Sequence, residues 1–321
     1  MDGCKCFMKV YYPSEKNLEY EQKIYKYLSD KANEDDYLNS AFIIPIQLIK
    51  DYKFPEIPNE INGVTRTIIG QIIRKNKPIN IIITRTYSDM QSLFNTLEEI
   101  NKTVNPISID IMTSILFQVL YAIFYMHTVL KLVHNDLHLD NILVKKYETP
   151  QTIKYSYLNK EYTIKTFYRI YMYDFDRGST SSLGENEFIK GELYRQNGII
   201  NGITNYDVYC FLFNISDFIL SNQMKQYFST KIEIISRLYL HIKLVNEKRY
   251  IWQKYCKLLS NGHCNDNLSG IEEDYDINAY LKDIIKYMTE NKLFTPETLK
   301  NKYLKYKTKY LQLKKEYLQL K

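Results

Sequence analysis

Two short motifs place carboxylates at spacings that suit phosphoryl-transfer chemistry. The first, HNDLHLDNILV at 134–144, sets Asp136 five residues before Asn141, and the apolar residues that follow resemble a short buried strand. The second, YDFD at 173–176, puts Asp174 directly after the strand-like run RIYMY. Phosphoryl transfer needs a carboxylate that accepts the substrate hydroxyl proton, oxygen ligands for magnesium, and cations on the phosphates. Asp136 is the candidate base, and Asn141 and Asp174 are the candidate metal ligands.

The spacing of the first motif has a physical reason. A loop that brings Asp136 to a hydroxyl must turn back within a few residues to offer a second oxygen to the metal. Asn141 suits that place because its amide oxygen binds a hard cation without adding negative charge. The alternative is a polar surface loop with chance Asp and Asn residues. The preceding His, the trailing apolar run and the Asp-Phe-Asp behind them favour the functional interpretation.

Together the motifs resemble those of the protein kinase superfamily, whose catalytic loop reads His-Arg-Asp-Leu-x-x-x-Asn and whose metal motif reads Asp-Phe-Gly. The resemblance implies an α+β, two-lobed kinase-like fold that uses ATP and Mg²⁺. It implies Asp136 as catalytic base, Asn141 and Asp174 as ligands of magnesium and ATP, and His134 as the structural residue that opens the loop. Asp207, at the head of an apolar helix, matches the buried Asp that supports this loop.

Three positions depart from the family pattern. Asn135 replaces an Arg that binds a regulatory phosphate, so control by phosphorylation is not expected there. Asp176 replaces the Gly, which argues against a flipping turn. His138 replaces a Lys that Ser/Thr kinases aim at the transferred phosphate, and we assign it a catalytic role. Asp-Leu-His at this place is similar to the haspin group of divergent Ser/Thr kinases.

A predicted hairpin adds to the haspin likeness. Apolar and aromatic residues alternate on both sides of the polar pair Asn159-Lys160, which is typical of two paired strands. Haspin-like kinases carry an insertion of this kind between the two motifs, whereas most kinases have a shorter loop. Any β-rich insertion would produce the same pattern.

The N-terminal segment supplies the expected cation. CKCFMKVYY at 4–12 is strand-like, and 15–28 has helical spacing. By resemblance, Lys9 reaches the ATP phosphates and Glu21 of the following helix pairs with it. Lys5 and Glu19 are the fallback residues, and the alternative is that both groups are simply solvated.

Only eight residues precede Lys9, so no Gly-rich loop is expected over the phosphates. Either the reading frame starts downstream of the true beginning, or the chain works without the loop, or it is a pseudokinase.

Further along the chain, NIIIT at 80–84 is typical of a buried strand, and Arg85 and Tyr87 then lie in the hinge that meets adenine. The apolar spacing of 109–130 predicts a helix that leads into the catalytic loop, with His127 near its end as a packing residue.

The C-terminal tail has three heptads, which predict a basic coiled-coil helix. The segment Lys300–Lys321 has a net charge of +7, whereas the whole chain has a net charge of +6. The remaining residues are therefore near neutral together, and nucleic-acid binding by the kinase body is not expected. Self-association or docking through 299–321 is favoured over binding to an acidic partner, nucleic acid or anionic lipid. We therefore divide the chain into a kinase-like domain at 1–292, with lobes at about 1–86 and 87–292, and a tail at 293–321.

Composition sets the expected surroundings. The five cysteines are scattered and odd in number, and free thiols fit better than a zinc site at Cys256, His263 and Cys264. No apolar stretch is expected to reach membrane-spanning length, and no signal peptide is recognised. The chain holds 31 tyrosines and is rich in Ile, Asn and Lys, as in AT-rich genes. Divergent kinases of large DNA viruses have such compositions, and AT-rich cellular hosts share them. The free thiols favour a reducing, intracellular setting, which is host cytoplasm or virion if the gene is viral.

Three functions remain open. The first is a divergent serine/threonine protein kinase that acts on a protein substrate. The second is a small-molecule phosphotransferase, because aminoglycoside and choline kinases share His-x-Asp-x-x-x-x-Asn and an Asp-aromatic-acid second motif. The third is a pseudokinase scaffold, which the missing Gly-rich loop suggests.

Overall fold

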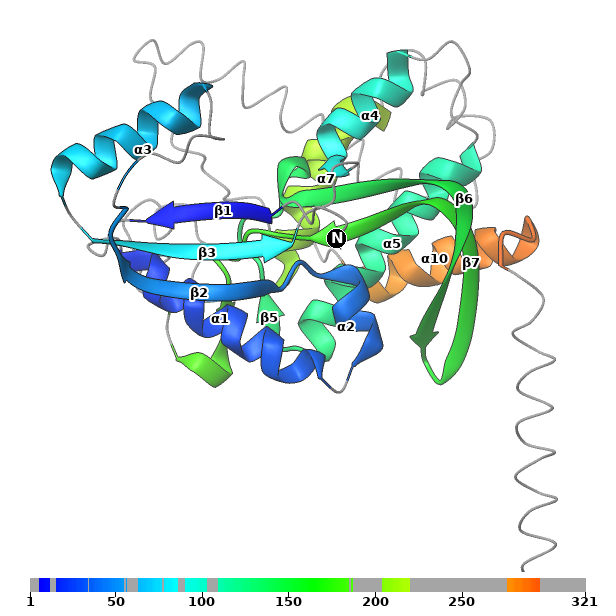
Figure 1. The fold of residues 1–321 in the computed structure, drawn as a ribbon. Coiled ribbons are helices and arrows are strands. Elements are labelled where there is room, and N and C mark those ends of the chain that lie inside the picture. The colour runs from blue at the N-terminus through cyan, green and yellow to red at the C-terminus, as the bar shows by residue number, and fades with distance from the viewer. Residues whose placement is uncertain are drawn as a thin grey trace, which may run out of the picture.

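The computed structural model describes residues 6–11, 16–33, 35–54, 56, 63–76, 78–85, 90–102, 109–184, 186, 204–219 and 276–294. Helices and small antiparallel sheets make up this part of the chain, which confirms the expected α+β class (Figure 1). The division into two lobes stays a prediction. The expected heptad helix lies outside the described residues, as do the candidate cysteines and histidine of a zinc site.

The first sheet has three antiparallel strands in the order β1-β3-β2. Its strands are β1 (Cys6–Tyr11), β2 (Pro45–Tyr52) and β3 (Ile79–Arg85). The strands expected at 4–12 and 80–84 are therefore present as β1 and β3. In the central strand β3, Ile79, Ile81 and Ile82 are all buried, as expected for a strand covered on both faces.

Two helices cover opposite faces of this sheet (Figure 1). Ile82 belongs to the main core together with Ile24 of α1 (Lys16–Ala32). Its neighbour Ile81 packs instead with Ile72 of α3 (Gly63–Lys75). Because successive strand side chains point to opposite faces, α1 and α3 lie on different sides of β3. The helix expected at 15–28 is thus confirmed as α1, and its Ile24 is fully buried in the core.

A short helix, α2 (Asp36–Ala41), follows α1. Asp35 caps it by accepting a hydrogen bond from the Leu38 amide at 3.0 Å. After it, the Ile43 amide donates to the Met172 carbonyl at 2.9 Å. This contact ties the N-terminal elements to the strand that ends beside Asp174.

The predicted hairpin is present but longer than expected. The strands β6 (Ile142–Tyr157) and β7 (Lys160–Met172) pair along almost their whole length, with an irregularity between Lys146 and Gln151. Leu158 and Asn159 form the turn with positive φ values of 49° and 62°, as a two-residue hairpin turn requires. The short strand after Asn141 and the run before Asp174 were expected as separate strands. They are instead the two ends of this hairpin.

The second sheet has the order β4-β6-β7, where β4 (Met90–Ser92) is followed by α4 (Leu93–Lys102). The aromatic face of the hairpin packs on α5 (Ile109–Thr128), where the Tyr155 ring centroid lies 4.9 Å from that of Phe117. Gln118 of α5 donates to the Tyr168 carbonyl at 2.9 Å and accepts from the Ile170 amide at 3.3 Å. The buried Gln118 side chain thus satisfies two backbone groups of β7 that would otherwise need a neighbouring strand.

The central helix α5 confirms the helix expected at 109–130, with Ile115, Val119, Ile123 and Met126 fully buried. From Asp110 to Thr128 it is long and apolar enough to cross a membrane by length and composition. The expectation that no stretch reaches that length was therefore wrong. This stretch is 78% buried against the other elements, as a core helix is.

The remaining described elements lie around α5 and the two sequence motifs. The helices α7 (Thr204–Ile219) and α10 (Ile277–Glu290) contribute to the same core. A two-stranded ladder joins β5 (Leu132–Val133) to β8 (Ser179–Thr180). Two short 3-10 helices, η1 (Leu139–Asn141) and η2 (Ser181–Leu183), complete the loops around the motifs.

Candidate active site

Lys9 and Glu21 meet as the sequence predicted. Lys9 Nζ lies 3.2 Å from Glu21 Oε1 and forms an ion pair with it. Glu21 is fully buried in α1, and its other oxygen accepts a hydrogen bond from the Tyr11 hydroxyl. Lys9 and Tyr11 stand two residues apart on β1 and therefore share a face of the sheet. The strand thus presents one cation and one donor to one buried carboxylate.

The same ammonium pairs with Asp174, 165 residues away in the sequence. Asp174 follows β7 and has a φ of 63°, a conformation that non-glycine residues adopt rarely and often at functional sites. Asp176 Oδ2 lies 3.9 Å from Lys9 Nζ, so a third carboxylate faces the same cation. Phe175, between these two acids, is fully buried against the rings of Tyr25 and His134.

Burial and charge compete in this cluster. Burial raises the pKa of Glu21 to about 7, although the Lys9 charge acts to lower it. Burial by itself lowers the pKa of Lys9, but the carboxylates around it raise the pKa above its usual value. The pKa of Asp176 is raised by burial and next by the charge of Asp174. The site therefore holds more negative charge than Lys9 alone balances, which favours a further cation.

Asp207 holds the loop that carries Asp136. Its two carboxylate oxygens accept hydrogen bonds from the amides of His134 and Asn135, both at 2.8 Å. His127 Nε2 lies 2.9 Å from Asp207 Oδ2, so this His supports the loop rather than reacting in it. Asp207 is fully buried at the first turn of α7. It stands in the supporting position that the resemblance implied.

His134 and Asn141 connect the loop to the metal motif. His134 Nε2 lies 2.9 Å from the Tyr173 carbonyl, and the Tyr173 amide donates to the Asn141 carbonyl at 3.0 Å. Asn141 also donates its side-chain amide to the Asp136 carbonyl at 2.8 Å. These contacts join the loop that carries Asp136 and Asn141 to Tyr173, the residue before Asp174.

The donor set fits a divalent metal ion. Asp174, Asp176 and Asn141 offer carboxylate and amide oxygens, which hard cations such as Mg²⁺ prefer. The Asn141 nitrogen is engaged with Asp136, which leaves the amide oxygen for a metal. Within the described ranges, no three His, Cys, Asp or Glu side chains are gathered as a preformed metal site.

No protein-family model matches the chain, and no curated protein matches it. Among solved structures, "WaaP in complex with acyl carrier protein" is similar to this chain with a TM-score of 0.39 and 14% sequence identity. The match covers 77% of this chain and 80% of that chain. A likeness of this degree assigns neither a family nor an activity, so function is inferred below from the side chains themselves.

Three candidate residues remain to be placed, namely His138, Arg85 and Tyr87. His138 Nδ1 accepts from the Asp140 amide at 3.3 Å and so caps η1, while its Nε2 lies 3.7 Å from Asp136 Oδ2. Its predicted contact with a phosphate stays a prediction. Arg85 ends β3 opposite Cys6, and Tyr87 lies outside the described residues. The adenine hinge is therefore untested.

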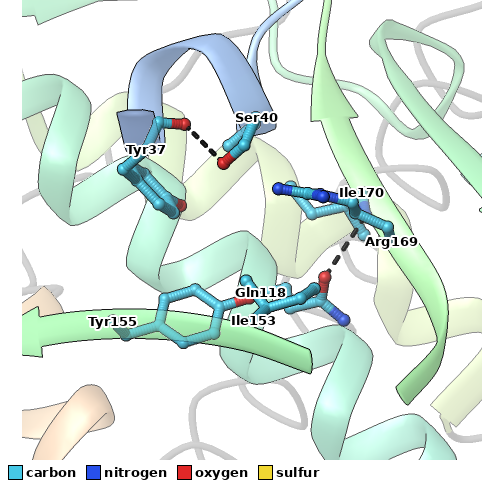
Figure 2. A pocket seen from close by; sticks show the side chains of 8 residues that line it. Tyr37, Ser40, Gln118, Ile153, Tyr155, Arg169 and Ile170 are labelled. Atoms are coloured by element: carbon cyan, nitrogen blue, oxygen red, sulfur yellow. Dashed lines mark hydrogen bonds between the residues drawn. The ribbon is translucent and has the colours of Figure 1, made fainter. Parts of the chain in front are cut away.

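A small pocket lies elsewhere in the fold. It opens between α2, α5 and the β6-β7 hairpin, where Tyr37, Gln118 and Arg169 line it (Figure 2). None of the predicted catalytic residues contributes to its wall. This pocket is consequently separate from the cluster around Asp136 and Asp174.

Two residues of the site were missed in the sequence. Tyr11 lies two residues after Lys9 on the same strand. Because alternate side chains of a strand point to the same face, the spacing could have predicted that Tyr11 lies beside Lys9. Arg177 follows the YDFD motif directly, and its Nη1 lies 3.0 Å from Asp136 Oδ1. Its place in the site depends on the turn after Asp174, which the motif alone does not specify.

Proposed function

We propose that the chain is an ATP-dependent phosphotransferase with a protein-kinase-like architecture. The observation that carries this proposal is the position of Lys9, whose ammonium pairs with both Glu21 and Asp174. A cation fixed by a buried carboxylate and placed beside a second, more exposed carboxylate suits the phosphates and metal of bound MgATP.

The proposed roles follow from the contacts. Lys9 binds the ATP phosphates, and Glu21 keeps its ammonium in place. Asp136 accepts the proton of the attacking hydroxyl, since its carboxylate is partly exposed beside Asn141. Asn141 and Asp174 hold the metal, with Asp176 close by. Bound Mg²⁺ would neutralise charge on the transferred phosphoryl group.

A serine or threonine hydroxyl of a protein is the first proposed acceptor. The support is the Asp207 contact with two loop amides and the long hairpin at the place of the haspin-like insertion. A small-molecule acceptor is the second. Asp176 supports a small-molecule acceptor, because the second motif of aminoglycoside and choline kinases also ends in an acid. Its carboxylate lies 3.9 Å from Lys9 Nζ. A pseudokinase scaffold is the third and predicts no transfer at all.

One labelling experiment distinguishes a protein acceptor from a small-molecule acceptor. The purified chain and its Asp136→Ala variant receive ATP labelled in the γ-phosphate with Mg²⁺. Mixed proteins are offered in one reaction, and aminoglycosides or choline in another. Label on protein that is lost in Asp136→Ala supports a protein kinase, and label only on small molecules overturns that assignment. Asp30→Ala on the exposed side of α1 is the matched control.

The pseudokinase alternative has its own readout. If neither class of acceptor is labelled, a thermal shift with MgATP reports whether nucleotide still binds. Stabilisation of the wild type but not of Lys9→Met would indicate a binding site without turnover. Absence of both labelling and stabilisation would contradict the phosphotransferase proposal.

A further inference from the structure

Arg177 makes the most direct cationic contact with the proposed base. Its Nη1 lies 3.0 Å from Asp136 Oδ1, and its side chain is 35% exposed, against 22% for Asp136. Hydrogen bonds between ionised partners are shorter and stronger than neutral ones, and they fix the orientation of a carboxylate. The Asp136 carboxylate is therefore held from one side by a charged group of the neighbouring motif.

The backbone of Arg177 is fastened to the same loop. Asn135 Nδ2 donates to the Arg177 carbonyl and to Ser179 Oγ, each at 3.0 Å. Asn135 is fully buried, and its own amide is bonded to Asp207 Oδ1 at 2.8 Å. Ser179 in turn pairs with Val133 in the β5-β8 ladder. The loop that carries Asp136 is thus bonded to the segment that carries Arg177, through residues next to both side chains.

Further contacts restrict the turn that presents Arg177. The Gly178 amide donates to the Phe175 carbonyl at 3.0 Å and closes the turn. Asn186 Nδ2 donates to the Gly178 carbonyl at 2.8 Å. Phe175, at the start of the turn, is fully buried. The backbone that carries the Arg177 side chain is consequently held by the core and by Asn135.

We propose that Arg177 is a positioning residue for Asp136 and that Asn135 presents Arg177 to it. The guanidinium holds Oδ1, which directs Oδ2 toward the acceptor hydroxyl. All partners in this arrangement are parts of the chain, so the base is oriented without a phosphate on the segment after the metal motif. The inference rests on the proposed phosphotransferase function and deepens it.

Steady-state turnover of ATP labelled in the γ-phosphate, with Mg²⁺ present, tests the proposal. Arg177→Ala is expected to lower kcat roughly 10- to 100-fold, because a misoriented base loses its reactive geometry. The KM for ATP should change less than about twofold, since the nucleotide contacts are untouched. Arg177→Lys should recover part of the rate, and added guanidinium at millimolar concentration should stimulate Arg177→Ala but not the wild type. Arg74→Ala, on α3, is the matched control.

The outcomes separate this inference from the function on which it rests. Wild-type turnover that depends on Asp136, together with an unchanged kcat in Arg177→Ala, would overturn the inference alone. A loss that guanidinium and Lys both fail to restore, with a raised KM and a lowered melting temperature, would indicate a purely structural residue and would also overturn it. A wild type without turnover would overturn both.

A double-mutant cycle tests the part assigned to Asn135. If Asn135 acts through Arg177, Asn135→Ala should lower kcat on the wild-type background and have little further effect on the Arg177→Ala background. Additive losses would show that Asn135 does not present Arg177. If Asn135→Ala fails to fold, Asn135→Ser in the same cycle supplies a smaller change with the same expected non-additivity.

Discussion

The ammonium of Lys9 on β1 pairs with the carboxylate of Asp174 at the end of β7, across 165 residues of sequence. Glu21 Oε1 pairs with the same ammonium at 3.2 Å. A cation held between two carboxylates is prepared for a phosphate ligand, because its position does not depend on the ligand. This relationship leads to the first prediction.

Lys9→Met should lower turnover of MgATP about 100-fold or more, because removal of a preorganised charge at a reacting phosphate has an effect of that size. Loss of the ammonium also leaves the buried Glu21 carboxylate without its charge partner, so a lower melting temperature is expected as well. Lys26→Met, an exposed lysine of α1, is the control. Equal turnover in Lys9→Met and in the wild type would exclude Lys9 from the site.

The buried Glu21 should give the stability of the chain a distinct pH dependence. Its pKa is about 7 in the folded chain and about 4.3 when unfolded, so its contribution is fully present below about pH 4 and is lost as the pH rises through 7. The free energy of unfolding of the wild type relative to Glu21→Gln should therefore decrease between pH 5 and pH 8, as measured by urea titration. Glu19→Gln, at a position of α1 that is 79% exposed, is the matched control. A difference that grows with pH would contradict the assignment.

Asp207 should be a stability residue as much as a functional one. Asp207→Ala leaves the buried amides of His134 and Asn135 without their acceptor, and the expected loss is about 2–4 kcal/mol in the free energy of unfolding. Chemical denaturation measures it, with Asp36→Ala on the exposed side of α2 as control. A variant of wild-type stability would show that the loop does not depend on this carboxylate.

Gly178 should tolerate no side chain. A Cβ at this position would lie 2.8 Å from Ile24 Cδ1 and 3.1 Å from the Phe175 carbonyl oxygen. Gly178→Ala is expected to lower the free energy of unfolding by about 1–3 kcal/mol through overpacking.

Ile24→Val removes the Cδ1 methyl group and should relieve part of this clash. The double variant should therefore be more stable than the sum of the two single effects predicts. Strict additivity in chemical denaturation would show that the turn moves away from α1 instead.

Much of the site was predictable because its residues lie close to regular elements. The resemblance to kinases assigned Lys9 to a strand, Glu21 to the following helix and Asp207 to the head of an apolar helix, and these elements are present as β1, α1 and α7. The hairpin was predictable from alternation around the polar pair Asn159-Lys160, although its turn lies one residue earlier, at Leu158 and Asn159, and Lys160 begins β7. In these cases local pattern and tertiary packing agree.

Other parts depend on contacts between distant segments. Strand β2 exposes most of its side chains, so its sequence has no alternation to reveal it. The contact between Arg177 and Asp136 requires both the turn closed by Gly178 and the side chain of Asn135. In the sequence, Asn135 differs from the family pattern only as the replacement of an Arg. Its bonds to the next motif could not be predicted from either motif alone.

The central claim is that Asp136 is the base of a phosphotransferase whose ATP site contains Lys9 and Asp174. Single-turnover transfer of the labelled γ-phosphate from MgATP, compared between the wild type and Asp136→Asn, tests it most directly. Both proteins should bind MgATP with similar affinity in calorimetry, and transfer by Asp136→Asn should be at least about 100-fold slower. Equal rates in the two proteins, or no binding of MgATP by the wild type, would contradict the claim.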